Sequence, residues 1–291
     1  MHELANRTEA AIGHLNGNRT KLFNSDYRNQ LAKMARAEEG KTSVAEFLGP
    51  QEKLVRLLET GFYLAGEKGM KAAVGRRGPP SKLQITKIYD ATAGYWDSFI
   101  QRAAYGHAYV GLLRHLRVEH WFDPLRGSIR VLDCGTGSGL LLTSLIKAMG
   151  RRPMELFGID LSTKMLDHAR RRLTAQGAIP ELGVADVCSL PFRDCEMDLV
   201  MGALVLEHVA EPVVALREMM RVVRPNARLV LVTTRPHAPD VLYRLVFRYR
   251  HFRYPQLLTW MGEAGIREIC SHQLAGIARW FGHAFVGRKP E

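Results

Sequence analysis

The stretch Ile129-Arg-Val-Leu-Asp-Cys-Gly-Thr-Gly-Ser-Gly-Leu-Leu-Leu142 decides the fold of this chain. Its opening residues are mostly β-branched or apolar, which predicts a short buried strand. Three alternating glycines follow at Gly135, Gly137 and Gly139, and glycine tolerates a positive φ and lets a ligand approach the backbone. The apolar spacing then becomes helical. The sequence therefore predicts a strand, a glycine turn and a helix N-terminus, whose free N–H groups can bind a ligand.

Acidic residues follow three strand-like segments. Asp133 stands at the end of the first strand, where a carboxylate suits a ligand with an ammonium group and would repel a pyrophosphate. Asp160 ends the segment that begins at Met154, about 20 residues after the glycine turn, where nucleotide-binding folds place the acid that binds a ribose diol. Asp186 follows the next segment. Leu140 stands close to where a dinucleotide fingerprint requires its third glycine, which argues against a dinucleotide.

Several segments in the same order resemble the class I S-adenosylmethionine (SAM)-dependent methyltransferases. Asp133-Cys-Gly-Thr-Gly-Ser-Gly139 fits the Asp/Glu-x-Gly-x-Gly-x-Gly motif of that family. The segments that resemble its later motifs are Gly158-Ile-Asp160-Leu-Ser, Ala185-Asp186, Met197-Asp-Leu-Val200 and Ala203-Leu-Val-Leu-Glu-His-Val209.

Within this family the chain most resembles the ubiquinone/menaquinone-biosynthesis type. There a Tyr-Asp-x-x-Ala-x-x-Tyr-Asp segment precedes the glycine motif, and here Tyr89 to Asp97 matches it with Trp96 in place of the second tyrosine. The resemblance covers residues 85 to 288. It is specific for the cofactor and the fold, and much less so for the substrate.

The resemblance implies the cofactor SAM, with S-adenosylhomocysteine (SAH) as product, and assigns the adenosine side of the site. Asp160 is expected to accept hydrogen bonds from both ribose hydroxyls, and Leu161 and Met165 to pack on adenine. Asp186 is expected to accept from the adenine amino group, with Val187 beside it.

On the methionine side, Asp133 is expected to face the amino acid part of the cofactor, directly or through water. The carbonyl of Ala203 is expected to meet the methionine ammonium, and the three glycines to let the backbone approach the ligand. Tyr89 and Trp96 are expected near the ligand, although an aromatic core helix is the usual meaning of such residues.

His208 is the candidate catalytic base, because it follows the fourth predicted strand beside the expected methyl group. A sulfonium methyl is intrinsically activated, so in-line positioning of the acceptor supplies much of the rate. A base is needed only where the acceptor must lose a proton. A structural histidine that caps the loop is an equally good interpretation, and Glu207 is a weaker candidate.

The middle of the chain alternates strands and helices, which predicts an α/β fold with a mostly parallel sheet and helices on both faces. The resemblance implies a Rossmann-like sheet of seven strands that ends in an antiparallel pair. The strands are expected at 129–133, 154–159, 180–185, 197–202, 227–233, 266–271 and 280–287, and the helices at 139–149, 162–176, 212–223, 238–250 and 256–264. Residues 85–291 form the methyltransferase domain in this interpretation.

Residues 1–84 fall outside the resemblance and predict amphipathic helices that form an N-terminal extension. This extension is expected to serve as a lid, a cap over the acceptor site or an arm for homodimerisation. An extension that only packs on the domain, without a function of its own, is an equally good interpretation, because the segment carries no residues typical of catalysis.

Residues 241–254 predict an amphipathic helix whose arginines include Arg244, Arg248 and Arg250. The formal net charge of +12 favours anionic partners, so this helix could bind an anionic membrane surface or guide an acidic substrate. An ordinary amphipathic helix with a solvated basic face is the favoured alternative. Nucleic acid is disfavoured as a partner, because no RNA-binding module accompanies the basic residues.

Composition excludes several classes of protein. No run approaches the roughly 18 apolar residues that cross a bilayer, and the first residues lack the apolar core of a signal peptide. The 4 cysteines form no Cys-x-x-Cys pair, so neither structural zinc nor a disulfide framework is expected. A cytoplasmic protein, with peripheral attachment to a membrane as a variant, is the expectation.

The leading interpretation is a SAM-dependent methyltransferase that acts on a small-molecule or lipid-like acceptor. One alternative is a phospholipid or quinone methyltransferase that works at the membrane surface. The alternative from another class is a SAM-binding scaffold without turnover that assembles through its N-terminal helices. The sequence leaves open whether oxygen, nitrogen, carbon or sulfur is methylated.

Overall fold

A computed structural model describes residues 81–102, 105–123, 127–235, 250 and 252–291. The predicted extension up to residue 80 lies outside the described residues, as does most of the predicted basic helix. The domain boundary at residue 84 and the roles suggested for the extension therefore stay predictions.

One seven-stranded sheet has the order β3-β2-β1-β4-β5-β7-β6. Every pairing is parallel except those of β7, which runs antiparallel to both β5 and β6. The predicted seven strands and the final antiparallel pair are confirmed. The strands are β1 Ile129–Cys134, β2 Met154–Asp160, β3 Glu181–Val184, β4 Met197–Ala203, β5 Val223–Thr234, β6 Arg267–Gln273 and β7 Gly282–Arg288.

Strand β5 begins four residues before its predicted start, because it contains an irregularity that periodicity does not reveal. Val223 pairs with Met197, and the register then shifts so that Arg228 pairs with Leu199. Asn226 within this bulge adopts a φ of 66°. Asparagine tolerates this left-handed conformation better than most residues, so the strand passes through the bulge without ending.

Helices flank the sheet at nearly the predicted positions. The segment before the first strand forms two α-helices and a short 3₁₀ turn. The helical elements are α4 Lys82–Arg102, α5 Tyr105–His115, η1 Val118–Trp121, α6 Leu140–Met149, α7 Thr163–Thr174, η2 Leu206–His208, α8 Pro212–Val222, α10 Tyr254–Glu263 and η3 Gly276–Trp280.

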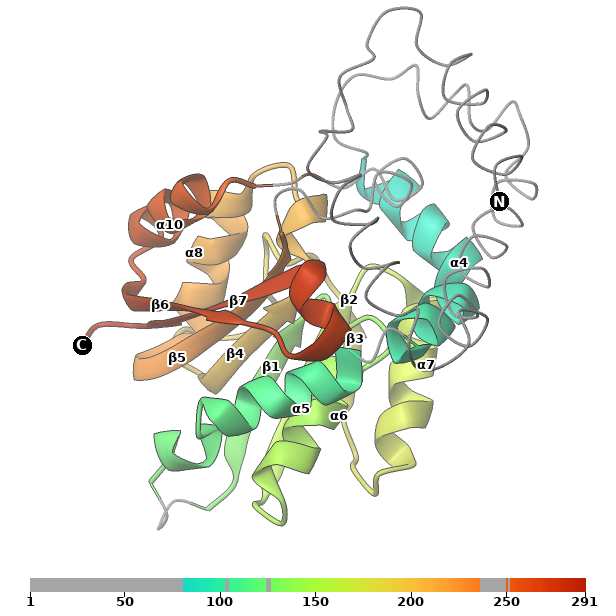
Figure 1. Ribbon diagram of the computed structural model, residues 1–291, viewed down its shortest axis with the longest axis horizontal. Coiled ribbons are helices and arrows are strands. Elements are labelled where there is room, and N and C mark those ends of the chain that lie inside the picture. The colour runs from blue at the N-terminus through green and yellow to red at the C-terminus, as the bar shows by residue number, and fades with distance from the viewer. Residues whose placement is uncertain (1–80, 103–104, 124–126, 236–249, 251) are drawn as a thin grey trace, which may run out of the picture. The chain divides into compact units, whose positions relative to one another are not determined.

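Two hydrophobic cores cover the two faces of the sheet. Helices α5 and α6 pack on one face, where Leu113, Leu142 and Leu145 are fully buried. Helices α8 and α10 pack on the other face, where Leu216 and Leu257 are fully buried (Figure 1). Because they are covered on both sides, the parallel strands β1 and β4 are mostly apolar, with Arg130, Asp133 and Asp198 as their charged residues.

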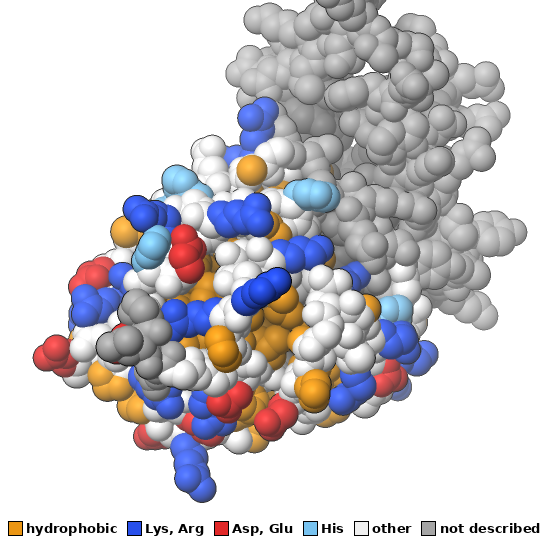
Figure 2. Space-filling model, turned by 90° about the horizontal axis from the view of Figure 1, so that it is seen from below, with side chains coloured by type: hydrophobic (Ala, Val, Ile, Leu, Met, Phe, Trp, Pro, Cys, Tyr) orange, Lys and Arg blue, Asp and Glu red, His pale blue; other side chains and the backbone are white. Residues whose placement is uncertain are grey.

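Opposite charges are interspersed on the described surface. Figure 2 shows one face on which Lys and Arg side chains alternate with Asp and Glu side chains around a group of hydrophobic ones. On this face the Lys and Arg side chains are therefore interrupted by acidic and hydrophobic ones. None of the helices in the described ranges has the length and apolar character that crossing a bilayer requires.

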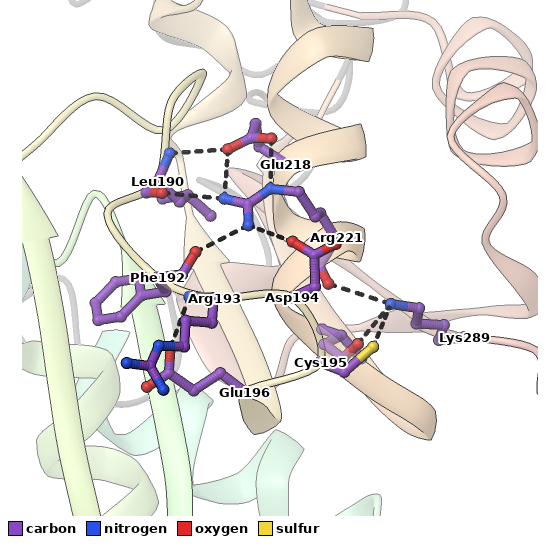
Figure 3. Close-up of polar contacts among 10 residues, drawn as sticks. Leu190, Phe192, Arg193, Asp194, Cys195, Glu196, Glu218, Arg221 and Lys289 are labelled. Carbon is purple, nitrogen blue, oxygen red and sulfur yellow. Dashed lines mark hydrogen bonds and ion pairs between the residues drawn. The ribbon is translucent and has the colours of Figure 1, made fainter.

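A network centred on Arg221 of α8 holds the loop between β3 and β4 (Figure 3). Its guanidinium donates to the Glu218 carboxylate in a fork, at 2.8 and 2.9 Å. It also donates to the carbonyls of Leu190 and Phe192 and to the Asp194 carboxylate, at 3.0, 2.8 and 2.8 Å. A bidentate pair adds geometric specificity, so Arg221 fixes the loop that follows Asp186 and Val187.

Replacing Arg221 by Met should lower the free energy of unfolding by about 1–3 kcal/mol. The substitution leaves two loop carbonyls without their donor and separates Glu218 from its cation, while the partial exposure of the pair limits the effect. Urea unfolding followed by circular dichroism measures the change. The matched control is Arg217→Met on the exposed side of the same helix, and an equal loss in both variants would contradict the role of the network.

Candidate functional site

The glycine turn between β1 and α6 adopts the predicted left-handed conformation. Gly135, Gly137 and Gly139 have φ values of 65°, 51° and 77°, which residues with a Cβ rarely adopt. A Cβ at Gly135 would lie 2.7 Å from Cγ2 of Val205, so this glycine is also required by a close contact. A Cβ at Gly137 would meet nothing within 4 Å. The turn therefore presents open space at its middle.

Strand β2 binds this turn through a backbone hydrogen bond. The Thr136 N–H donates to the carbonyl of Ile159 at 2.8 Å, and its side chain lies against Gly158. A Cβ at Gly158 would lie 3.1 Å from Cγ2 of Thr136 and 2.7 Å from Cδ2 of Leu182. Gly158 thus gives the glycine turn the room to lie on the sheet.

Asp133 is a buried carboxylate below the turn, with 1% of its surface exposed. Its Oδ2 accepts a hydrogen bond from the Thr136 hydroxyl at 2.9 Å, while Oδ1 has no hydrogen-bond partner among the described residues. Burial raises the pKa of Asp133 to about 7. A buried carboxylate oxygen that lacks a donor fits a ligand that brings a cationic or N–H group, as the sequence predicted.

Asp160 lies at the end of β2 and binds the glycine turn directly. Its Oδ2 accepts from the Gly137 N–H and its Oδ1 from the Ser162 N–H, both at 2.9 Å. Burial raises the pKa of Asp160, and these backbone hydrogen bonds counteract the increase. A carboxylate has about four acceptor positions, so Asp160 can still accept from a further donor.

The contacts of Asp90 connect helix α4 to this corner. Ser162 caps α7 by accepting from the Met165 N–H at 3.1 Å, and its hydroxyl donates to Asp90 Oδ1 at 2.5 Å. Asp90 was not among the predicted site residues. Its position directly after Tyr89 in the matched segment was the signal, but no spacing in the sequence relates α4 to the start of α7.

The predicted adenine side is only partly assembled in this structure. Met165 and Val187 are buried, with 1% and 5% of their surfaces exposed, and Leu161 is half-buried. Asp186 forms an ion pair with Lys82 of α4 and accepts from the Cys188 N–H at 2.9 Å. Burial raises the pKa of Asp186, but the hydrogen bonds from Lys82 and Cys188 outweigh it and leave this pKa below its usual value.

A half-buried pair, Tyr89 and His208, lies beyond the end of β4. The Tyr89 hydroxyl lies 2.7 Å from Nε2 of His208, and the two rings meet edge to face with centroids 5.3 Å apart. Burial raises the pKa of Tyr89 well above its usual value and lowers that of His208 to about 4. At neutral pH the pair therefore consists of a phenol and a neutral imidazole, which can accept a proton.

Glu207 does not occupy the position of a base. Its carboxylate is buried and accepts from the Thr234 N–H at 2.6 Å and from the Thr234 hydroxyl at 3.1 Å. Arg250, predicted to face a membrane or an acidic substrate, donates to the backbone carbonyls of Val209 and Ala210. The guanidinium of Arg250 therefore has partners within the protein, and its contact with a membrane or an acidic substrate stays a prediction.

The remaining predicted residues are placed as follows. Ala203 is the half-buried last residue of β4, next to Leu204, whose φ is 57°. Trp96 lies on α4, and its side chain is outside the described part of the structure. Within the described ranges, no three His, Cys, Asp or Glu side chains gather in a way that could hold a metal ion.

The chain is similar to known methyltransferases in sequence. A family model described as "Methyltransferase domain" matches residues 132–231. The ubiquinone/menaquinone biosynthesis C-methyltransferase of Desulfotalea psychrophila is 30% identical over 173 residues, which cover 60% of this chain and 67% of that protein. The enzyme of the same name from Laribacter hongkongensis is 34% identical over 108 residues, which cover 37% of this chain and only 44% of that protein.

Solved structures support the fold. A structure titled as the [4+2]-cyclase SpnF aligns with a TM-score of 0.56 at 18% identity, covering 73% of this chain and 98% of that one. At this identity the likeness concerns the fold alone. The same architecture thus occurs in a protein titled a cyclase, so the reaction must be argued from the residues of the site.

The pKa of Asp133 leads to a testable pH dependence of binding. A ligand with an ammonium group favours ionised Asp133, so the affinity for SAH should increase by up to about tenfold as the pH rises through the pKa from about 6 to about 8. Calorimetric titration at both pH values measures this change. Asp133→Asn should bind SAH more weakly and with little pH dependence, and a slope equal to that of the wild type would assign the effect to another group.

Proposed function

The chain belongs to the class I SAM-dependent methyltransferases of the ubiquinone/menaquinone-biosynthesis type, and from this premise we propose that it methylates a ring carbon of a quinol-like acceptor. The names of its relatives support this acceptor class, since they are C-methyltransferases of quinone biosynthesis. The observation that carries the proposal is the contact between the Tyr89 hydroxyl and Nε2 of His208. Carbon methylation of a phenol-type ring requires loss of a proton, and this pair can take one.

Residues of the glycine corner would hold the cofactor. Asp160 and the backbone of the glycine turn would bind the ribose, and Asp133 would bind the methionine end, consistent with its unpartnered oxygen. SAM supplies, when bound, a methyl group made electrophilic by its sulfonium sulfur. Asp186 would accept a hydrogen bond from the adenine amino group in place of its ion pair with Lys82.

The pair would remove a proton from the acceptor. Tyr89 donates to the imidazole when Nε2 of His208 is unprotonated, so a proton from an acceptor hydroxyl can pass to the Tyr89 oxygen while the Tyr89 proton passes to Nε2. The resulting phenolate places electron density on the ring carbon next to it, and this carbon would bond to the methyl group as the bond between sulfur and methyl breaks and SAH leaves. Loss of the hydrogen from the methylated ring carbon and reprotonation of the ring oxygen then restore the aromatic hydroxyl. Because burial disfavours both the Tyr89 phenolate and the His208 imidazolium, His208 would hold the proton only during the transfer.

Turnover with a short-chain demethylated naphthoquinol tests the proposed acceptor. The full chain, SAM and the reduced quinol should release SAH and yield a product one methyl group heavier, with the new group on a ring carbon by NMR. Vesicles of phosphatidylethanolamine serve as the competing acceptor. Turnover on the lipid alone would contradict the quinol assignment, and SAH binding without turnover on any acceptor would favour a non-catalytic scaffold.

His208→Gln should lower kcat with the quinol by about 10²–10⁴-fold, the usual contribution of a general base. Tyr89→Phe should lower kcat as well, because it removes the hydroxyl that contacts Nε2. The affinity for SAH should change by less than about threefold in both variants, since neither residue is needed to bind the ribose or the methionine end. Steady-state kinetics and calorimetry provide the two values, and an unchanged kcat in His208→Gln would exclude it as the base.

Asp160→Ala should weaken SAH binding by about 2–4 kcal/mol, because charge-assisted hydrogen bonds are worth roughly 1.5–3 kcal/mol each and do not add fully. Part of this loss reflects a looser glycine turn, since Asp160 also accepts from the Gly137 N–H. Asp167→Ala, on an exposed position of α7, is the matched control and should bind SAH normally. An unchanged dissociation constant for Asp160→Ala would refute the ribose assignment.

A further inference from the structure

The turn that carries His208 begins with a strained residue. Leu204 follows β4 with a φ of 57°, a conformation that costs a non-glycine residue about 1 kcal/mol or more. Its N–H donates to the Val232 carbonyl of β5 at 2.7 Å. Strained residues of this kind persist only where the surrounding structure holds them, and they concentrate at functional sites.

Glu207 binds the same turn to the end of β5. It neighbours His208 in the η2 turn, yet its carboxylate points to Thr234 and accepts from both the N–H and the hydroxyl of that residue. With 1% of its surface exposed, Glu207 is among the most buried charged side chains in the described ranges. Desolvating a carboxylate is costly, so a buried glutamate at this position indicates a role beyond packing.

Arg250 holds the turn from its other side. Its backbone N–H donates to the Glu207 carbonyl at 3.0 Å, and its guanidinium donates to the carbonyls of Val209 and Ala210. The turn is thus attached to β5 through Leu204 and Glu207 and to the segment before α10 through Arg250. Of the residues adjacent to His208 in the chain, Glu207 is the one whose side chain makes such a contact.

We propose that Glu207 is a positioning residue for the methyl transfer. Its carboxylate binds Thr234 and so holds the η2 turn, which keeps the His208 imidazole in contact with the Tyr89 hydroxyl. This inference deepens the proposed function and rests on it for the reaction. It assigns Glu207 no contact with substrate or cofactor. A shift of about 1 Å in a catalytic group can reduce a rate by about 10²-fold, so an anchor of this kind can control turnover.

Two substitutions separate the hydrogen bond from the charge. Glu207→Leu removes both acceptor oxygens at similar volume, whereas Glu207→Gln keeps a carbonyl oxygen for the Thr234 N–H and removes the charge. With the quinol acceptor, Glu207→Leu should lower kcat by about ten- to hundredfold and leave KM and the SAH dissociation constant within about threefold. Glu207→Gln should retain kcat within about threefold of the wild type, which is the rescue that positioning predicts.

Glu211→Gln is the matched control, because Glu211 is exposed shortly after the same turn and makes no side-chain capping bond to α8. It should leave kcat unchanged. A folded Glu207→Leu variant with normal SAH affinity and wild-type kcat would overturn the proposal. So would a loss expressed in KM alone, because displacement of the base must reduce kcat.

Hydrogen exchange measured by mass spectrometry tests the anchor without any acceptor. Glu207→Leu should speed exchange in peptides that contain residues 204–210 and Thr234, and Glu207→Gln should not. Unchanged exchange in Glu207→Leu would refute the anchor. If the wild type turned over none of the acceptors while this local effect was present, the proposed function would fail and the anchoring contact would stand.

Discussion

The contact between Gly135 and Val205 is the constraint on which the rest of the site depends. The methyls of Val205 occupy the space that a Cβ at position 135 would need, and Val205 also lies against Gly202. The glycine turn after β1 and the turn after β4 are therefore packed directly on each other. Because β1 and β4 are adjacent parallel strands, their carboxyl ends bring the cofactor corner and the Tyr89–His208 pair to one edge of the sheet.

Burial sets the chemistry at this edge. The same desolvation raises the pKa of the Asp133 carboxyl and lowers that of the His208 imidazole, in each case by disfavouring the charged form. Near neutral pH, Asp133 is therefore close to its pKa, and His208 is neutral. Burial thus shifts the pKa values of these two groups in opposite directions and favours the neutral form of each.

Helix α4 connects the parts of the site through polar side chains. Lys82 reaches Asp186 beyond β3, Asp90 reaches Ser162 at the start of α7, and Tyr89 reaches His208 beyond β4. One helix therefore contacts residues that follow three different strands. Its Tyr-Asp dipeptide contacts both the η2 turn, through Tyr89, and the start of α7, through Asp90.

The sequence by itself determined the parts that depend on local chemistry. Glycines at 135, 137 and 139 require positive φ, Ser162 favours a helix start, and apolar runs form buried parallel strands, so the corner and the alternating fold could be predicted. Tertiary structure alone decided which side chains meet. Glu207 and His208 are neighbours in the chain, but the turn directs one carboxylate to Thr234 and the other side chain to Tyr89. Arg250 belongs to a basic stretch of sequence, yet its guanidinium donates to the backbone carbonyls of Val209 and Ala210, which the fold brings next to it. Periodicity describes the face of one element, whereas these partners come from segments 27 to 119 residues apart, whose meeting depends on strand order.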